Sequence, residues 1–101
     1  MSDRYAAYTK LKFDYPAERI LRLTFDRPET YNSVDAETHT QLTHVWRDID
    51  NDPDINAVIV TGAGKAFSAG GDFELIKGLL DNPSARMATW KEAKDLVYNV
   101  I

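Results

Sequence analysis

A short apolar run that leads straight into a glycine-rich segment is the strongest constraint on how this sequence folds. The run Ala57-Val58-Ile59-Val60 is unbroken and largely β-branched. It predicts a strand covered on both faces, as in a parallel sheet. The segment from Val60 to Phe73, VTGAGKAFSAGGDF, follows at once and is rich in glycine, so its backbone can come close to another group. That group could be a phosphate, a thioester or another part of the protein.

Hydropathy patterns around this segment predict an α/β chain with the order ββα, then ββα. Apolar and polar residues alternate over Leu11–Phe13 and Leu21–Phe25, which predicts an antiparallel hairpin. Apolar residues at helical spacing predict further helices, with Asp35, Asp72 and Ser84 as their N-caps. We predict strands at about 10–14, 19–26, 57–61 and 66–69, and helices at about 35–50, 73–80 and 84–101.

The charge balance argues against two kinds of partner. The chain has 12 basic and 16 acidic residues and a net charge of −4. Proteins that bind nucleic acid or anionic membranes non-specifically need a basic face, so we expect neither partner. No segment has the length and hydropathy of a signal peptide or a membrane span, and a cytoplasmic location is therefore expected.

Metal-ligating residues are sparse in this sequence. Cysteine is absent, and His39 and His44 are five positions apart, which does not place them one helical turn apart as in a metal-binding pair. We predict no metal site and expect both histidines to be solvated.

The glycine-rich segment does not match either of two phosphate-binding motifs. A phosphate loop needs Ser or Thr after Gly-Lys, but Ala66 follows Gly64 and Lys65. The dinucleotide-binding fingerprint needs a glycine three residues after Gly64, where this chain has Phe67. The sequence therefore gives no support for phosphate binding by these motifs.

A different mechanism fits Gly70-Gly71-Asp72, where a tight loop enters a predicted helix. The first N–H groups of a helix lack intrahelical acceptors and lie at its positive end. Because positions 70 and 71 are glycine, no side chain blocks an oxygen atom from reaching the N–H of Gly71, as the stabilisation of an oxyanion requires. The alternative is that the glycines only permit a sharp turn and that Asp72 is only an N-cap.

These motifs together resemble the enoyl-CoA hydratase/isomerase (crotonase) family. The match extends from about Ile20 to Leu80, with the elements in the family's order, and its most specific part is the run Ala-Phe-Ser-Ala-Gly-Gly-Asp after a strand. The matching segments are Arg27-Pro28, Asn32-Ser33-Val34, Ala57–Gly62 and Lys65–Phe73. The resemblance implies an α/β, crotonase-like spiral of ββα units. Residues 1–101 would be the N-terminal portion of a single domain, in a chain that looks truncated.

The resemblance also implies an enzyme that binds an acyl-CoA thioester and stabilises its enolate in a backbone oxyanion hole. The family's first donor N–H falls at Gly71. Other positions are implied to bind substrate, with Ala66 and Ser68 near the adenine and Ser33 near the bend of the CoA. The implied substrate-binding residues are Ser33, Ala66, Ser68, Gly70, Asp72 and Phe73. No metal and no cofactor beyond the CoA moiety of the substrate is implied.

In the family, the second oxyanion donor and the acid/base carboxylates lie in a later segment that these residues do not contain. We therefore expect the fragment alone to be inactive. The resemblance also implies that the intact protein is a homotrimer or hexamer. Two alternatives stay open. One is a thioester hydrolase, dehalogenase or decarboxylase on the same scaffold, and the other is a non-catalytic subunit that binds acyl-CoA.

Overall fold

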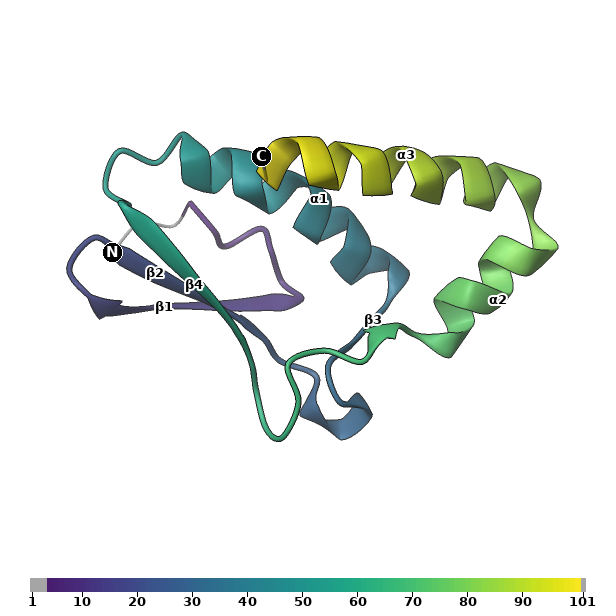
Figure 1. The fold of residues 1–101 in the computed structure, drawn as a ribbon, viewed down its shortest axis with the longest axis horizontal. Helices are drawn as coiled ribbons and strands as arrows, with labels where there is room; N and C mark the ends of the chain where they lie inside the picture. The colour runs from purple at the N-terminus through teal and green to yellow at the C-terminus, as the bar shows by residue number, and fades with distance from the viewer. Residues whose placement is uncertain (1–3, 101) are drawn as a thin grey trace.

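The computed structural model describes residues 4–100, with side chains for residues 4–97, and consists of a small sheet packed against helices (Figure 1). Its elements are β1 (Leu11–Ala17), β2 (Ile20–Phe25), the 3₁₀ helix η1 (Pro28–Thr30), β3 (Ser33–Val34), α1 (Ala36–Asp50), β4 (Ala57–Gly62), β5 (Gly70–Gly71), α2 (Phe73–Asp81) and α3 (Pro83–Val100). The main sheet has the order β1-β2-β4, and β3 pairs with β5 in a separate two-stranded ladder.

The pairing of β2 with its two neighbours determines where the glycine-rich segment lies. β1 and β2 form the predicted antiparallel hairpin, with Leu11 opposite Phe25. β2 and β4 are parallel, from Ile20 opposite Ala57 to Phe25 opposite Gly62. Because parallel strands end at the same edge of a sheet, the segment after β2 and the segment after β4 leave the sheet side by side.

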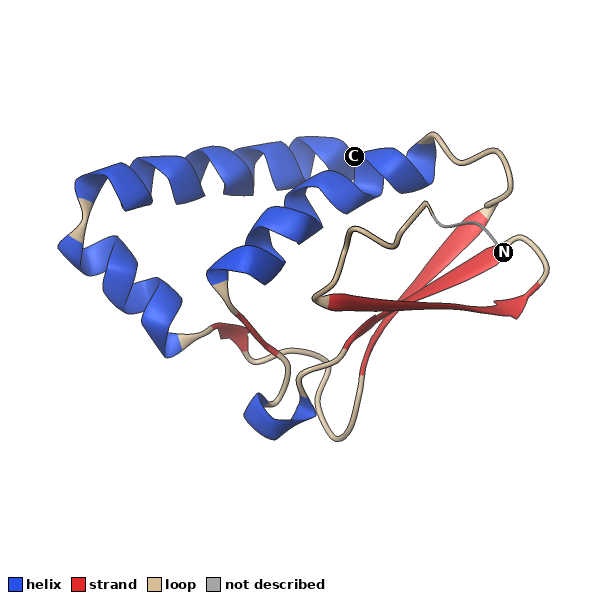
Figure 2. Cartoon of the chain, turned by 180° about the vertical axis from the view of Figure 1, so that it is seen from behind, coloured by secondary structure: helices blue, strands red, loops and turns tan. Residues whose placement is uncertain are grey.

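The core lies between the sheet and α1, the helix that separates the sheet from α3 (Figure 2). Leu21 and Leu23 of β2 and Val45 of α1 are each 0% exposed. Fully burying a leucine side chain stabilises a fold by about 1.5–3 kcal/mol, so this contact contributes substantially to stability. The remaining buried apolar residues of this cluster are Tyr5, Leu11, Phe25, Leu42 and Ile49.

The caps of the helices agree with the prediction at two of three positions. Asp35 accepts a hydrogen bond from the Thr38 N–H, and Asp72 accepts one from the Leu75 N–H, both at 2.8 Å. The predicted cap Ser84 is wrong, because α3 begins at Pro83 and the side chain of Asn82 accepts from the Ser84 N–H instead. Proline lacks an N–H and fits the first turn of a helix.

Two other predictions, one about His39 and one about β4, require correction. His39 is not a solvated residue, because its Nδ1 lies 2.9 Å from Oε1 of Glu92 on α3 and its side chain is 17% exposed. Ile59 of β4 is 46% exposed, so within residues 4–97 this strand is covered on one face and not on two. β4 is an edge strand of the described sheet.

The strand predicted over 66–69 is not formed. The extended pairing lies at β5 instead, where Gly70 is opposite Ser33 and Gly71 is opposite Val34. Residues 66–69 form no strand, and one of them, Ser68, bonds through its side chain to the Asn32 carbonyl. Glycines carry no side chain, so hydropathy alternation could not have revealed the β5 ladder. The helix predicted over 84–101 is observed as α3, and Ile101 lies outside the described residues.

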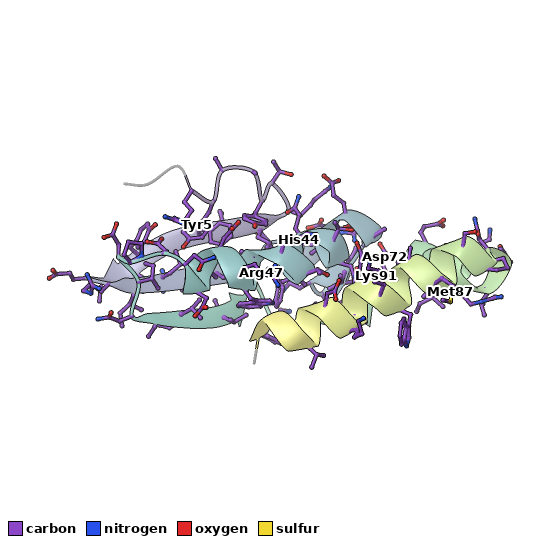
Figure 3. All side chains as sticks on the ribbon, turned by 90° about the horizontal axis from the view of Figure 1, so that it is seen from above. Tyr5, His44, Arg47, Asp72, Met87 and Lys91 are labelled. Atoms are coloured by element: carbon purple, nitrogen blue, oxygen red, sulfur yellow. The ribbon has the colours of Figure 1, made fainter. Side chains whose placement is uncertain are left out.

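α2 and the start of α3 extend away from the core. α2 has no buried residue, with Phe73 77% and Leu80 73% exposed. On α3, Met87 is 66% exposed and lies far from Tyr5, near one end of the molecule (Figure 3). α2 and the start of α3 therefore have little contact with the core, whereas Leu96, near the end of α3, packs against it.

Candidate active site

Asn32 is the centre of the turn that follows β2. Tyr31 and Asn32 both have left-handed backbone angles, with φ of 54° and 58°, and asparagine adopts that region more readily than most residues. The Asn32 N–H donates to the Arg27 carbonyl at 2.8 Å, and Asn32 Oδ1 accepts from the Arg27 N–H at 2.8 Å. The backbone and the side chain of Asn32 therefore both close the turn by bonding to Arg27, and Asn32 is 1% exposed.

The same asparagine side chain also holds the glycine loop, defined as residues 63–69 between β4 and β5. Asn32 Nδ2 donates to the carbonyls of Ala63 and Ala66, at 2.8 and 2.7 Å. The Asn32 carbonyl accepts from Ser68 Oγ at 2.8 Å. A buried polar group left without a partner costs about 1–3 kcal/mol, so these bonds fix the path of the loop strongly.

Gly62 is required because the glycine loop folds back over the end of β4. A Cβ at this position would lie 2.3 Å from the carbonyl oxygens of both Ala66 and Phe67, far inside van der Waals contact. The ring of Phe67 in turn packs edge-on against Phe25, with ring centroids 5.2 Å apart. The loop is thus attached to the sheet by backbone contact and by one aromatic pair.

The N–H of Gly71 faces away from β3. The Asp72 N–H donates to the Val34 carbonyl at 2.8 Å, and Val34 is the partner of Gly71 in the parallel ladder. Backbone N–H groups alternate in direction along a strand, so when the N–H of Asp72 faces β3 the N–H of Gly71 faces the other way. Gly71 is exposed, and Gly70 before it has a φ of 91°, which favours glycine.

The carboxylate of Asp72 has two partners. Its Oδ1 caps α2, and its Oδ2 lies 3.0 Å from Nη1 of Arg27. The hydrogen bond to Asp72 raises the pKa of Arg27 above its ordinary value, so the guanidinium is charged at any working pH. The site therefore combines a helix N-terminus, an exposed backbone N–H and a compensated carboxylate.

The structure brings most of the predicted site residues together. Ser33 and Gly70 are opposite each other in the ladder, and Ser68 Oγ accepts from the Gly70 N–H at 3.1 Å. Ser33 Oγ donates to Thr30 Oγ1 at 2.9 Å. The carbonyl of Ala66 is occupied by Asn32, as described above. Asp72 follows the ladder directly, and the side chain of Phe73 points into solvent.

Sequence reasoning assigned no role to Arg27 or Asn32, although both belong to the segments that carry the family resemblance. Their contacts are made across 31 to 45 positions of sequence, for example from Asn32 to Ala63 and from Arg27 to Asp72. No local spacing could reveal them. The available signal was an asparagine after a proline-containing turn, which is a common site of left-handed backbone.

A hollow of about 440 Å³ lies beside this site. Ser33 and Arg27 are part of its wall, whereas Gly71 and Phe73 are not. Two lysines in the wall pair with carboxylates, Lys10 with Asp35 at 3.8 Å and Lys12 with Asp26 at 3.6 Å. Since these charges compensate one another, the hollow offers no excess of charge to an anionic ligand.

Comparison with known proteins identifies the family to which this chain belongs. The family model for enoyl-CoA hydratase/isomerase matches residues 16–101. The chain therefore belongs to the enoyl-CoA hydratase/isomerase family. The match includes the turn after β2, the glycine loop and the start of α2.

Two curated relatives illustrate the similarity. A mevalonyl-coenzyme A hydratase of Beauveria bassiana is 37% identical over 60 residues, which are 59% of this chain and 21% of the relative. An (E)-benzylidenesuccinyl-CoA hydratase of Thauera aromatica is 39% identical over 59 residues, which are 57% of this chain and 23% of the relative. The chain thus spans less than a quarter of the length of these two relatives.

Solved structures confirm the predicted crotonase-like α/β fold. The crystal structure of an enoyl-CoA hydratase/isomerase from Mycobacterium paratuberculosis superposes with a TM-score of 0.84 at 33% identity, over 90% of this chain and 36% of the other. An enoyl-CoA hydratase from Bacillus anthracis shares the fold, with a TM-score of 0.75 at 23% identity, over 90% and 35% of the two chains. Within the part of the chain that the structure describes, no helix has the length and apolar character needed to cross a membrane.

Proposed function

We propose that this chain is the acyl-CoA-binding portion of an enzyme that hydrates or isomerises a double bond conjugated to a CoA thioester. In this proposal the N–H of Gly71 binds the carbonyl oxygen of the thioester. The observation that carries it is the N–H of the exposed residue Gly71, turned away from β3 in a chain of the enoyl-CoA hydratase/isomerase family. The names of the two curated relatives above favour hydration within this family.

The proposed chemistry is electrostatic. When a nucleophile adds to the double bond, or a proton leaves the carbon next to the thioester, negative charge develops on the carbonyl oxygen. A fixed N–H at the N-terminus of α2 stabilises that charge without reorganisation, and removing one such donor typically lowers the rate about a hundred- to a thousandfold. We expect the second donor and the acid/base carboxylates to come from a segment outside these 101 residues. The fragment alone should then lack activity.

The substrate-binding roles remain predictions, and the contacts in the structure limit what each residue can offer. The hydroxyls of Ser33 and Ser68 already donate hydrogen bonds within the protein. A bond from either hydroxyl to the substrate would therefore have to be made in addition to these or in place of them. Phe73 is 77% exposed directly after the Gly71-Asp72 pair and offers apolar surface to an acyl chain. A cytoplasmic location and a homotrimeric or hexameric assembly also stay predictions.

Two substitutions at the same position test the proposal in the complete protein. Gly71→Pro removes the N–H, and Gly71→Ala keeps it. A Cβ at this position would lie 3.5 Å from Leu75 Cδ2, an ordinary contact. We expect kcat for crotonyl-CoA hydration to fall about a hundred- to a thousandfold in Gly71→Pro and to change little in Gly71→Ala. Circular dichroism checks that both variants are folded.

The outcomes separate the alternatives. Full activity of a folded Gly71→Pro variant would refute the oxyanion assignment. Tight binding of CoA esters without turnover by the wild-type protein would instead favour the non-catalytic subunit. Hydrolysis of the thioester, detected as free thiol, would favour a different reaction on the same scaffold.

A further inference from the structure

We propose that Arg27 is a positioning residue, which holds the N–H of Gly71 in its orientation by joining the carboxylates of Asp35 and Asp72. The inference rests on the proposed function of Gly71. Arg27 acts through two helix caps and not by contact with the reacting atoms.

Three contacts of Arg27 at this site are made by one nitrogen atom of its guanidinium. Nη1 lies 3.0 Å from Oδ2 of Asp72 and 3.8 Å from Oδ2 of Asp35, and it donates to the carbonyl of Ser33 at 3.4 Å. These partners belong to β3, to the start of α1 and to the start of α2. The guanidinium therefore lies where three elements converge.

The two carboxylates occupy equivalent places in the chain. Each follows a two-residue strand directly, Asp35 after β3 and Asp72 after β5. Each also uses Oδ1 to cap its helix and leaves Oδ2 for Arg27. By joining the two Oδ2 atoms, Arg27 ties together the ends of both strands of the ladder.

The ladder needs such support because it is very short. Even a hairpin of two full strands is only marginally stable in water without further packing. β5 consists of two exposed glycines, which have no side chains to pack and great conformational freedom. The direction of the Gly71 N–H therefore depends on how firmly the next residue, Asp72, is held.

The negative charge of Asp72 is a second reason why the site needs Arg27. A carboxylate close to a developing oxyanion would oppose it, because like charges in a partly buried site repel. Asp72 is 13% exposed at its side chain, and within residues 4–97 Arg27 is the cation placed against it. Asp35 has a further cation, Lys10, at 3.8 Å. Loss of Arg27 would therefore remove the cation that compensates the charge of Asp72, whereas Asp35 would keep Lys10.

Two variants of the complete protein break the contact from either side. Arg27→Gln removes the cation, and Asp72→Asn removes the charge while its side-chain oxygen can still cap α2. We expect Arg27→Gln to lower kcat about ten- to a hundredfold, with KM changed less than about twofold, because the N–H is misplaced and not lost. Asp72→Asn should lower kcat less, because it removes the opposing carboxylate together with the contact. The double variant should be no worse than either single one, since both remove one interaction.

Arg22→Gln is the matched control, because Arg22 also pairs with a carboxylate, Asp14, but does so on the sheet and away from the site. It should leave kcat unchanged. Hydrogen–deuterium exchange of peptides that cover residues 70–75 should be faster in Arg27→Gln and Asp72→Asn and unchanged in Arg22→Gln.

Unchanged kcat and exchange in folded Arg27→Gln and Asp72→Asn would overturn the inference, as would an equal loss of kcat in Arg22→Gln. If the proposed function itself is wrong, the result is different, because a folded Gly71→Pro variant would then be active, whether or not Arg27→Gln is. An inactive Gly71→Pro together with a fully active Arg27→Gln would refute the positioning role alone.

Discussion

The core between the sheet and α1 and the region from the glycine loop to α2 are held together in different ways. In the core, Leu21, Leu23 and Val45 are fully buried, and apolar contact provides the stability. In the second region α2 has no buried residue; the hydrogen bonds of Asn32 fix the glycine loop, and the ion pair of Arg27 holds Asp72 at the start of α2. The difference teaches that this chain places its candidate site on a segment held largely by polar contacts, next to an apolar core.

The largest effect on stability is expected in the core. Leu23→Ala removes a side chain that is 0% exposed and leaves a cavity, which should lower the free energy of unfolding by about 2–5 kcal/mol. Ile59→Ala is the control, because Ile59 is 46% exposed, and should cost less than about 1 kcal/mol. Urea denaturation measures both. Similar losses in the two variants would mean that the apolar core is not where the stability lies.

The second effect tests the polar support of the glycine loop. Asn32→Ala leaves the Ala63 and Ala66 carbonyls and the Arg27 N–H without their partner, and should cost about 1–3 kcal/mol. Asn56→Ala, at an exposed asparagine that accepts one bond from Arg19, should stay within about 0.5 kcal/mol.

Hydrogen–deuterium exchange locates the effect of Asn32→Ala. Exchange should rise more in residues 63–69 than in β2, because the loop loses its anchor while the core keeps its side-chain packing. A uniform rise in exchange over both regions would contradict the conclusion that the core and the glycine loop are held by different contacts.

The third effect compares two neighbouring glycines. Gly70 has a φ of 91°, so Gly70→Ala should cost about 1–2 kcal/mol although nothing lies within 4 Å of the new Cβ. Gly71 has no positive φ, so Gly71→Ala should stay within about 0.5 kcal/mol. Thermal denaturation of the two variants gives the comparison, and equal costs would argue against the β5 geometry.

Sequence reasoning worked where side chains decide the structure. The alternation of Leu21, Leu23 and Phe25 predicted β2, and the acceptors Asp35 and Asp72 predicted two helix starts, because these signals are local. The strand over 66–69 failed because the real ladder is built from glycine backbone.

The residues of the candidate site also differ in whether the sequence could predict their roles. Gly71 was proposed from the family resemblance and from the absence of a side chain. The roles of Arg27 and Asn32 depend on partners more than 30 positions away, Ala63, Ala66 and Asp72, and follow only from the folded chain. Long-range polar contacts leave no periodic pattern in a sequence.

The smallest expected effect concerns pH and a polar contact of the core itself. Tyr5 Oη donates to Asp52 Oδ2 at 2.7 Å, and this bond, followed by one from the Asp54 N–H, lowers the pKa of Asp52 below its ordinary value of 3.8. Tyr5→Phe should therefore lower the free energy of unfolding at pH 7 by about 0.5–1.5 kcal/mol.

The pH dependence of that loss follows from linkage. A carboxylate with a lowered pKa in the folded state stabilises the fold above its unfolded pKa, here 3.8, and the contribution disappears as the pH falls through the lower folded value. The difference between wild type and Tyr5→Phe should be constant from pH 7 to 5 and shrink below 3.8. Urea titrations at each pH measure it, with Asp52→Asn as the variant that removes the pH-dependent part. A difference that stays constant on acidification would show that Tyr5 stabilises the fold by packing and not through the Asp52 carboxylate.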